Sequence, residues 1–138
     1  MIVKVVKRNQ FLKVIFKATL KAVDALLKEV NVFLHKYKIV GSKFGLDLCL
    51  REALNNAIVH GAGEDEEELI LFWLKKEKNR LCFFVRDPGS GFNYLRYGQK
   101  PNELTPSGWG LFLLANYTSG YKFFPPGNKL LFWFDLEE

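Results

Sequence analysis

Glu52 and Asn56 stand out in this sequence as side chains whose types and spacing could perform chemistry. They lie four residues apart in a segment whose apolar spacing predicts a helix, so their side chains share one helix face. Asn55 and Asn56 are poor helix formers, and two adjacent asparagines within an apolar helix require an explanation. One explanation is an exposed polar stripe. The functional explanation is a carboxylate and an amide oxygen that face a cleft.

A second group of candidate residues follows a predicted strand, within residues 87–91. Gly89 and Gly91 would let the backbone approach a ligand closely, because neither carries a Cβ. The carboxylate of Asp87 could accept a hydrogen bond from a ligand's amino group. Aspartate and glycine also form ordinary turns, so this motif alone is weak.

A third group opens a predicted short helix and consists of Gly108, Trp109, Gly110 and Leu111. The free backbone N–H groups at a helix start, together with the helix dipole, suit the binding of phosphate. This motif is also weak alone. The combination is much stronger, because the three groups follow one another on a helix, a strand end and a helix start.

Together the three motifs resemble the GHKL ATP-binding fold that histidine kinases and gyrase-type ATPases share. Within that group the sequence looks most like the small anti-sigma factor serine kinases of bacteria. The first motif has their form E-A-x-x-N-A-x-x-H-G over residues 52–61, the loop between the two glycine motifs is short, and no second domain is expected within these 138 residues. The resemblance covers about residues 10–136, nearly the whole chain.

The resemblance implies a role for each matching position. Asn56 matches the asparagine that holds Mg²⁺ through its side-chain oxygen, and Glu52 matches the carboxylate that acts as general base or orients the attacking group. Asp87 matches the aspartate that recognises the adenine amino group. The remaining matches are the two glycine boxes, the second of which meets the phosphates through backbone amides: Gly89, Gly91, Gly108, Trp109, Gly110 and Leu111.

The activity that the resemblance implies is that of a cytoplasmic, Mg-ATP-dependent anti-sigma factor serine/threonine kinase. Such a protein binds a sigma factor, phosphorylates an anti-sigma antagonist protein on Ser or Thr, and works as a homodimer. An alternative is a module of the same fold that binds ATP as an allosteric ligand without phosphotransfer. Residues 105–107 favour this alternative modestly, because the family often carries a basic residue near that position.

The rest of the chain predicts the elements that must position these residues. Segments rich in β-branched and aromatic residues, separated by turns and helices, predict strands over residues 2–7, 11–17, 69–76, 80–87, 120–124 and 129–136. Spacings of three and four predict helices over residues 18–38, 44–60 and 110–117, the first capped by Thr19. Trp73 and Trp133 fit strand patterns and are predicted to lie in the core. This order predicts one α+β domain over residues 1–138, a two-layer sandwich whose mixed, mostly antiparallel sheet packs against helices.

Composition limits the remaining function classes. The chain has 138 residues, of which 49% are hydrophobic, which suits one domain with a sizeable core and excludes global disorder. No apolar run approaches the roughly 20 residues that span a bilayer, so no transmembrane segment is expected. The two cysteines, Cys49 and Cys82, are too few for a disulfide scaffold and are expected to be buried free thiols.

Charge is distributed unevenly along the chain. Residues 1–43 hold ten basic and two acidic residues, a net of +8, whereas residues 44–138 carry a net of −3. A uniformly basic nucleic-acid binder would not have this pattern, so no direct contact with nucleic acid is expected. The basic segment is either a solvated surface or a surface that meets an acidic partner or lipid. The five acidic residues at 64–68 are predicted to form a solvated loop.

Overall fold

The structure is a computed structural model that describes residues 1–39, 43–91 and 109–136. Six strands form one sheet in the order β1-β2-β3-β4-β6-β5, and all five strand pairings are antiparallel. The strands are β1 (Ile2–Arg8), β2 (Phe11–Lys17), β3 (Leu69–Glu77), β4 (Arg80–Arg86), β5 (Gly120–Phe124) and β6 (Lys129–Asp135). The predicted two-layer α+β sandwich is confirmed, with a sheet that is antiparallel throughout rather than mixed.

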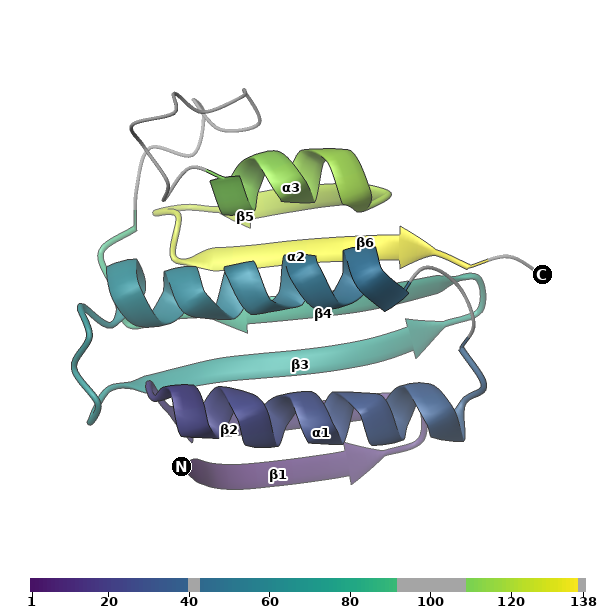
Figure 1. Cartoon of the computed structure of the whole chain (residues 1–138), viewed down its shortest axis with the longest axis horizontal. Helices are drawn as coiled ribbons and strands as arrows, with labels where there is room; N and C mark the ends of the chain where they lie inside the picture. The colour runs from purple at the N-terminus through teal and green to yellow at the C-terminus, as the bar shows by residue number, and fades with distance from the viewer. Residues whose placement is uncertain (40–42, 92–108, 137–138) are drawn as a thin grey trace.

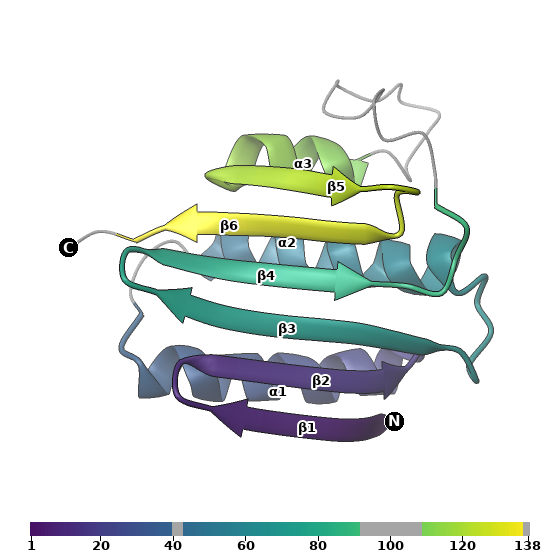
Figure 2. The same cartoon turned by 180° about the vertical axis from the view of Figure 1, so that it is seen from behind.

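The helices of the described residues cover a single face of the sheet. They are α1 (Leu20–Lys36), α2 (Lys43–Asn56) and α3 (Trp109–Tyr117), and all three lie in front of the strands in Figure 1. The reverse view in Figure 2 shows the strands in front and the helices behind them. No helix of the described part of the chain is long and apolar enough to cross a membrane.

Helix α1 follows from its sequence pattern and its cap. The hydroxyl oxygen of Thr19 accepts a hydrogen bond from the backbone N–H of Ala22 at 3.1 Å, which satisfies one of the free donors at the helix start. Its buried residues recur at intervals of three and four, which turns one stripe of the helix toward the sheet. The predicted cap and helix are therefore confirmed.

The core lies between the helices and the sheet. Alternate strand positions are buried on this side, and the large side chains among them include Phe16, Phe72, Phe83 and Phe132. The rings of Phe83 and Phe132 stack with their centroids 5.1 Å apart. Both cysteines are buried free thiols, as expected.

The remaining strand positions point to the opposite side of the sheet, which we call the helix-free face. Trp73 and Trp133 lie there and are only half-buried, so their predicted place in the core was wrong. Period-two alternation shows which residues share a face, but it does not show which face the helices cover. The other members on the interior strands are Phe11, Lys13, Ile15, Lys17, Leu69, Leu71, Lys75, Glu77, Arg80, Cys82, Phe84, Arg86, Lys129, Leu131 and Asp135.

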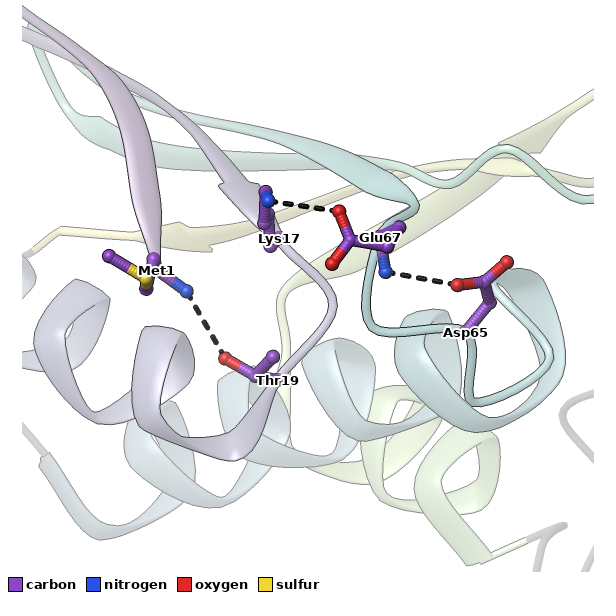
Figure 3. Close-up of polar contacts among 5 residues, drawn as sticks. All are labelled: Met1, Lys17, Thr19, Asp65 and Glu67. Atoms are coloured by element: carbon purple, nitrogen blue, oxygen red, sulfur yellow. Dashed lines mark hydrogen bonds and ion pairs between the residues drawn. The ribbon is translucent and has the colours of Figure 1, made fainter.

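The acidic residues 64–68 connect the helical layer to β3 and are exposed, as predicted. Figure 3 shows how they join β2: the Lys17 ammonium lies 3.0 Å from a carboxylate oxygen of Glu67, whose backbone N–H donates to Asp65 at 3.0 Å. The same view shows the amino group of Met1 donating to the hydroxyl oxygen of Thr19 at 3.2 Å. Exposed ion pairs contribute little individually, so the acidic stretch remains a solvated connection.

Candidate functional site

Helix α2 does not end as a regular α-helix. It continues into one π-helical turn, Ala57–Gly61, in which the backbone N–H of Ala62 donates to the carbonyl of Ala57 at 2.8 Å. The helix predicted over residues 44–60 is therefore present, but its last turn is wider than expected. Single π-turns of this kind are frequent at functional sites, because they change the direction of side chains at the end of a helix.

Asp87 directly follows β4 and is held by the turn between β5 and β6. Its backbone N–H donates to the carbonyl of Asn128 at 3.0 Å, and its own carbonyl accepts from the side-chain amide of Asn128 at 3.0 Å. One carboxylate oxygen, Oδ1, also accepts from the backbone N–H of Gly89 at 2.8 Å. These three bonds fix both the backbone and the carboxyl group of Asp87.

Three glycines allow the chain to pack this closely around Asp87. A Cβ placed on Gly61 would overlap the carboxyl group of Asp87, and one placed on Gly89 would lie 2.7 Å from the carbonyl oxygen of Gly61. Gly91 has a φ of +90°, and a Cβ there would overlap the carbonyl of Pro126. The first glycine motif therefore has a structural role in addition to the close ligand approach that its sequence suggests.

A cavity of about 190 Å³ opens between the end of α2 and strands β4, β5 and β6. Asn56 and Asp87 line it together, although they are far apart in the sequence. This volume is smaller than the roughly 300–1,000 Å³ of pockets that enclose a whole drug-sized ligand, so it suits one ring system of a larger ligand. The other lining residues are Ala53, Ala57, His60, Gly61, Val85, Gly91, Phe123, Gly127, Asn128, Lys129 and Leu130.

The carboxyl group of Asp87 is electrostatically unusual. Burial raises its pKa, and the hydrogen bond from the Gly89 backbone lowers it in part. Displaced pKa values of carboxyl groups in a cavity are a common feature of binding sites. Side-chain oxygen Oδ1 of Asn128 is also buried and has no hydrogen-bond partner among the described residues.

Glu52 is half-buried one turn before Asn56 on α2, and it is not among the residues that line the cavity. Burial and the negative charge of Glu52 together raise the pKa of the Cys49 thiol to about 11. The thiol also lies 3.7 Å from the carbonyl oxygen of Leu113 on α3. Cys49 is therefore a packing residue between two helices, since thiols of high pKa react poorly.

The second glycine motif is described in part. The residues from Trp109 to Leu111 form the first turn of α3, which begins one residue earlier than the predicted helix. Gly108 lies outside the described residues. The backbone N–H groups at the start of this nine-residue helix remain available as donors by the ordinary geometry of a helix terminus.

Sequence patterns missed several lining residues. His60 belongs to the first motif, which assigns it no ligand contact, yet it is exposed and lines the cavity. Lys129 is also at the cavity, and its ammonium donates to the carbonyl of Pro125 at 3.3 Å. The clamp between Asn128 and Asp87 spans 41 residues, and no local pattern in the sequence indicates it.

No group of three or more His, Cys, Asp or Glu side chains in the described part of the chain is arranged to hold a metal ion. A cation at the cavity would therefore take few ligands from the protein, with Asn56 as the nearest match to a hard-cation ligand. Mg²⁺ binds in this way beside phosphates, because it keeps several waters and uses one or two protein oxygens. The side-chain oxygen of Asn56 at the cavity would suit this mode of binding.

Residues 16–133 match the sequence model of the family described as the histidine kinase-like ATPase domain. The match covers most of the chain, so the protein belongs to this family. The fold and the family define the class as an ATP-binding, kinase-like domain. A search of curated proteins found no match.

Proposed function

We propose that this protein is an Mg-ATP-dependent anti-sigma factor serine/threonine kinase. It would bind a sigma factor and phosphorylate an anti-sigma antagonist protein on Ser or Thr. The observation that supports nucleotide binding is that Asn56 and Asp87 line one cavity in a chain of the histidine kinase-like ATPase family. The assignment to the anti-sigma factor kinases is supported by the motif over residues 52–61, which has the form found in those proteins.

The cavity has the chemistry of a site for adenine. Its walls include Val85, Phe123 and Leu130, whose apolar side chains suit the faces of a planar base. The carboxylate of Asp87 lies at the same cavity and can accept a hydrogen bond from the exocyclic amino group. Because Gly61 crowds that carboxyl group, the position of the hydrogen-bond acceptor is fixed before the ligand arrives.

Three parts of the chain would take part in phosphate binding and transfer. Asn56 would hold Mg²⁺ through its side-chain oxygen, and the metal would neutralise the charge of the phosphates. The start of α3, at Trp109 and Gly110, would donate backbone N–H groups to phosphate oxygens, together with Gly108. Glu52 would orient the attacking hydroxyl group or accept its proton.

The proposed partners rest on the resemblance to anti-sigma factor kinases. They are a sigma factor, an antagonist protein that carries the phosphorylated Ser or Thr, and a second copy of this chain in a homodimer. The proposal also locates the protein in the cytoplasm, where a sigma factor would be met.

Phosphotransfer is the decisive test. The protein is incubated with Mg-ATP and candidate antagonist proteins, and phosphoserine or phosphothreonine is measured by mass spectrometry. Calorimetry with ATP, ADP and GTP, with and without Mg²⁺, is run in parallel. Tight ATP binding with no phosphorylated antagonist would reject the kinase, whereas absence of ATP binding would reject the nucleotide site itself.

Residues 105–107 favour one alternative, in which ATP regulates partner binding without phosphotransfer, because they lack the basic residue that the family often carries near that position. The Glu52→Gln variant separates the two functions. A kinase would keep ATP binding and lose phosphotransfer, whereas a regulatory module would keep its regulation unchanged.

A further inference from the structure

A row of five side chains crosses the centre of the helix-free face, from β2 to β5. The strand register places Lys13 beside Trp73, Trp73 beside Phe84, and Phe84 beside Leu131, with Lys122 on the far side of Leu131. Two cations therefore flank an apolar centre. We call these five residues the central row.

The apolar centre of the row is accessible from outside. Trp73, Phe84 and Leu131 are each half-buried, and no helix of the described residues covers this side of the sheet. Lys122 is exposed, and its ammonium lies 5.0 Å from the centre of the Phe124 ring. Bulky apolar side chains that stay partly exposed between cations are typical of an interaction surface.

The charge of the helix-free face is strongly positive. Cations border the central row on both sides, from Arg8 and Lys75 on one side and from Lys4, Arg86 and Lys129 on the other. On the strands of the described residues, the acidic side chains of this face gather at one end.

These acidic side chains already have partners. Asp135 lies 3.2 Å from Arg80, and Glu77 lies 3.9 Å from Lys75. Lys4, Lys13 and Lys122 have no acidic partner within ion-pair distance among the described residues. Their charge is available to attract a negatively charged partner.

We propose that the central row docks an acidic protein segment whose apolar side chains cover Trp73 and Phe84. Lys13 and Lys122 are separated by four strand spacings, which is about 19 Å at roughly 4.8 Å per spacing. An extended segment that crosses the strands would place acidic residues about six positions apart at these lysines, with apolar residues between them. This occupant follows from the pattern of cation, apolar centre and cation.

Other occupants fit the face less well. The rings of Trp73 and Phe84 already stack on each other at 5.2 Å, so one face of each ring is covered and less ring surface is left to stack on nucleic-acid bases. A second copy would bring the same cations against each other, which opposes association. Insertion into a bilayer requires exposed apolar side chains, and on the interior strands of the described residues Leu69 alone among the large apolar side chains is exposed.

This surface is separate from the nucleotide cavity. The cavity is lined by Val85, Phe123 and Leu130, which are buried on the helix side of β4, β5 and β6. The five residues of the central row are on the other side of the same sheet, and Lys129 is the one described residue that both borders the row and lines the cavity. Docking and ATP binding can therefore be measured independently in one protein.

The test uses the full chain and a fluorescent peptide of about ten residues, with two glutamates at each end and leucine alternating with serine between them. Binding is measured by anisotropy for the wild type, for a Lys13→Glu/Lys122→Glu variant, and for a Lys21→Glu/Lys28→Glu control. The control changes the net charge equally at exposed positions of α1. We expect the first variant to lose affinity at least about tenfold and the control to stay within about threefold.

Two further measurements serve as controls for the fold and for the charge of the peptide. Thermal unfolding and ATP calorimetry of both variants show whether the fold and the cavity are intact, and the single Lys122→Glu variant replaces the double variant if the latter unfolds. A peptide with lysines in place of the glutamates is expected not to bind.

Several results would overturn the proposal. The proposal is wrong if the wild-type protein does not bind the glutamate peptide at about 1 mM. It is also wrong if the two double variants lose peptide affinity equally. Tighter binding of phosphatidylserine vesicles or of oligo-dT, lost in the Lys13→Glu/Lys122→Glu variant, would assign the face to lipid or nucleic acid instead. A wild-type dimer in sedimentation that this variant dissociates would assign it to a second copy.

Discussion

Asn128 holds Asp87 by two hydrogen bonds, one through its backbone carbonyl and one through its side-chain amide, each 3.0 Å long. This clamp joins the end of β4 to the turn before β6 and keeps the Asp87 carboxyl group at the cavity. An Asn128→Ala substitution removes the side-chain bond and leaves the backbone bond. We expect a loss of about 1 kcal/mol in the free energy of unfolding and a several-fold weaker affinity for ATP.

Urea denaturation and calorimetry check the effect of the clamp. The substitution also removes the buried, unpaired oxygen Oδ1 of Asn128, which reduces its cost to stability. A matched control is Asn55→Ala, since Asn55 is exposed on α2. If Asn128→Ala binds ATP as tightly as the control does, the clamp has no part in recognition.

The two adjacent asparagines of α2 provide a second prediction. Asn56 lines the cavity and is half-buried, whereas Asn55 is exposed. We expect Asn56→Ala to abolish the dependence of nucleotide binding on Mg²⁺ and Asn55→Ala to leave it unchanged. Calorimetry with ATP, in Mg²⁺ and in excess chelator, measures this dependence. Equal behaviour of the two variants would remove Asn56 from the proposed metal site.

A comparison of the Gly61→Ala and Gly63→Ala variants provides a third prediction. A Cβ on Gly61 would overlap the carboxyl group of Asp87, whereas one on Gly63 would meet nothing within 4 Å. Gly63 has a φ of +62°, so Gly63→Ala is expected to cost about 1 kcal/mol of stability through backbone strain alone. We expect Gly61→Ala to displace Asp87 and to weaken ATP binding by at least about tenfold, and Gly63→Ala to leave it unchanged.

Thermal unfolding and ATP calorimetry of both variants separate strain from displacement. The proposed fit of the glycine to Asp87 would be contradicted by normal ATP affinity in folded Gly61→Ala. A Gly63→Ala variant that loses ATP binding would instead show that the whole turn matters.

Much of this fold could be predicted because strands and helices leave periodic apolar patterns. The high content of Val, Ile and Phe in residues 11–17 predicts β2, and the apolar stripe from Leu20 to Tyr37 predicts α1. Alternation does not say which face a helix covers, so Trp73 and Trp133 were assigned to the core. Deciding this requires the three-dimensional packing of α1 and α2.

Only those residues of the candidate site that belong to recognisable motifs could be predicted from the sequence. Asn56 and Asp87 were identified from their motifs, and the structure brings them to one cavity. The π-helical turn at Ala57–Gly61 depends on one additional residue in a helical turn, which apolar spacing does not reveal. The role of Asn128 depends on a contact across 41 residues and could not be found from local sequence.

The raised pKa of Asp87 leads to the last prediction, which concerns pH. Burial raises this pKa above its ordinary value of 3.8, so the folded state disfavours the ionised carboxyl group more than the unfolded state does. The ionised form therefore costs stability at neutral pH, and this cost decreases as the pH falls through the raised pKa toward 3.8. Asp87→Asn keeps an oxygen that can accept from Gly89 and removes the charge.

We expect Asp87→Asn to unfold at neutral pH with a free energy equal to or above that of the wild type. The difference should shrink as the pH falls through the raised pKa and vanish only below about 3.8, where Asp87 is protonated in both the folded and the unfolded wild type. The same variant should bind ATP more weakly at neutral pH, and wild-type affinity should fall as acid protonates the carboxylate that accepts from the amino group. Urea denaturation and ATP calorimetry across this range measure both trends, and a variant that is less stable yet binds ATP normally would show that Asp87 serves the fold rather than the ligand.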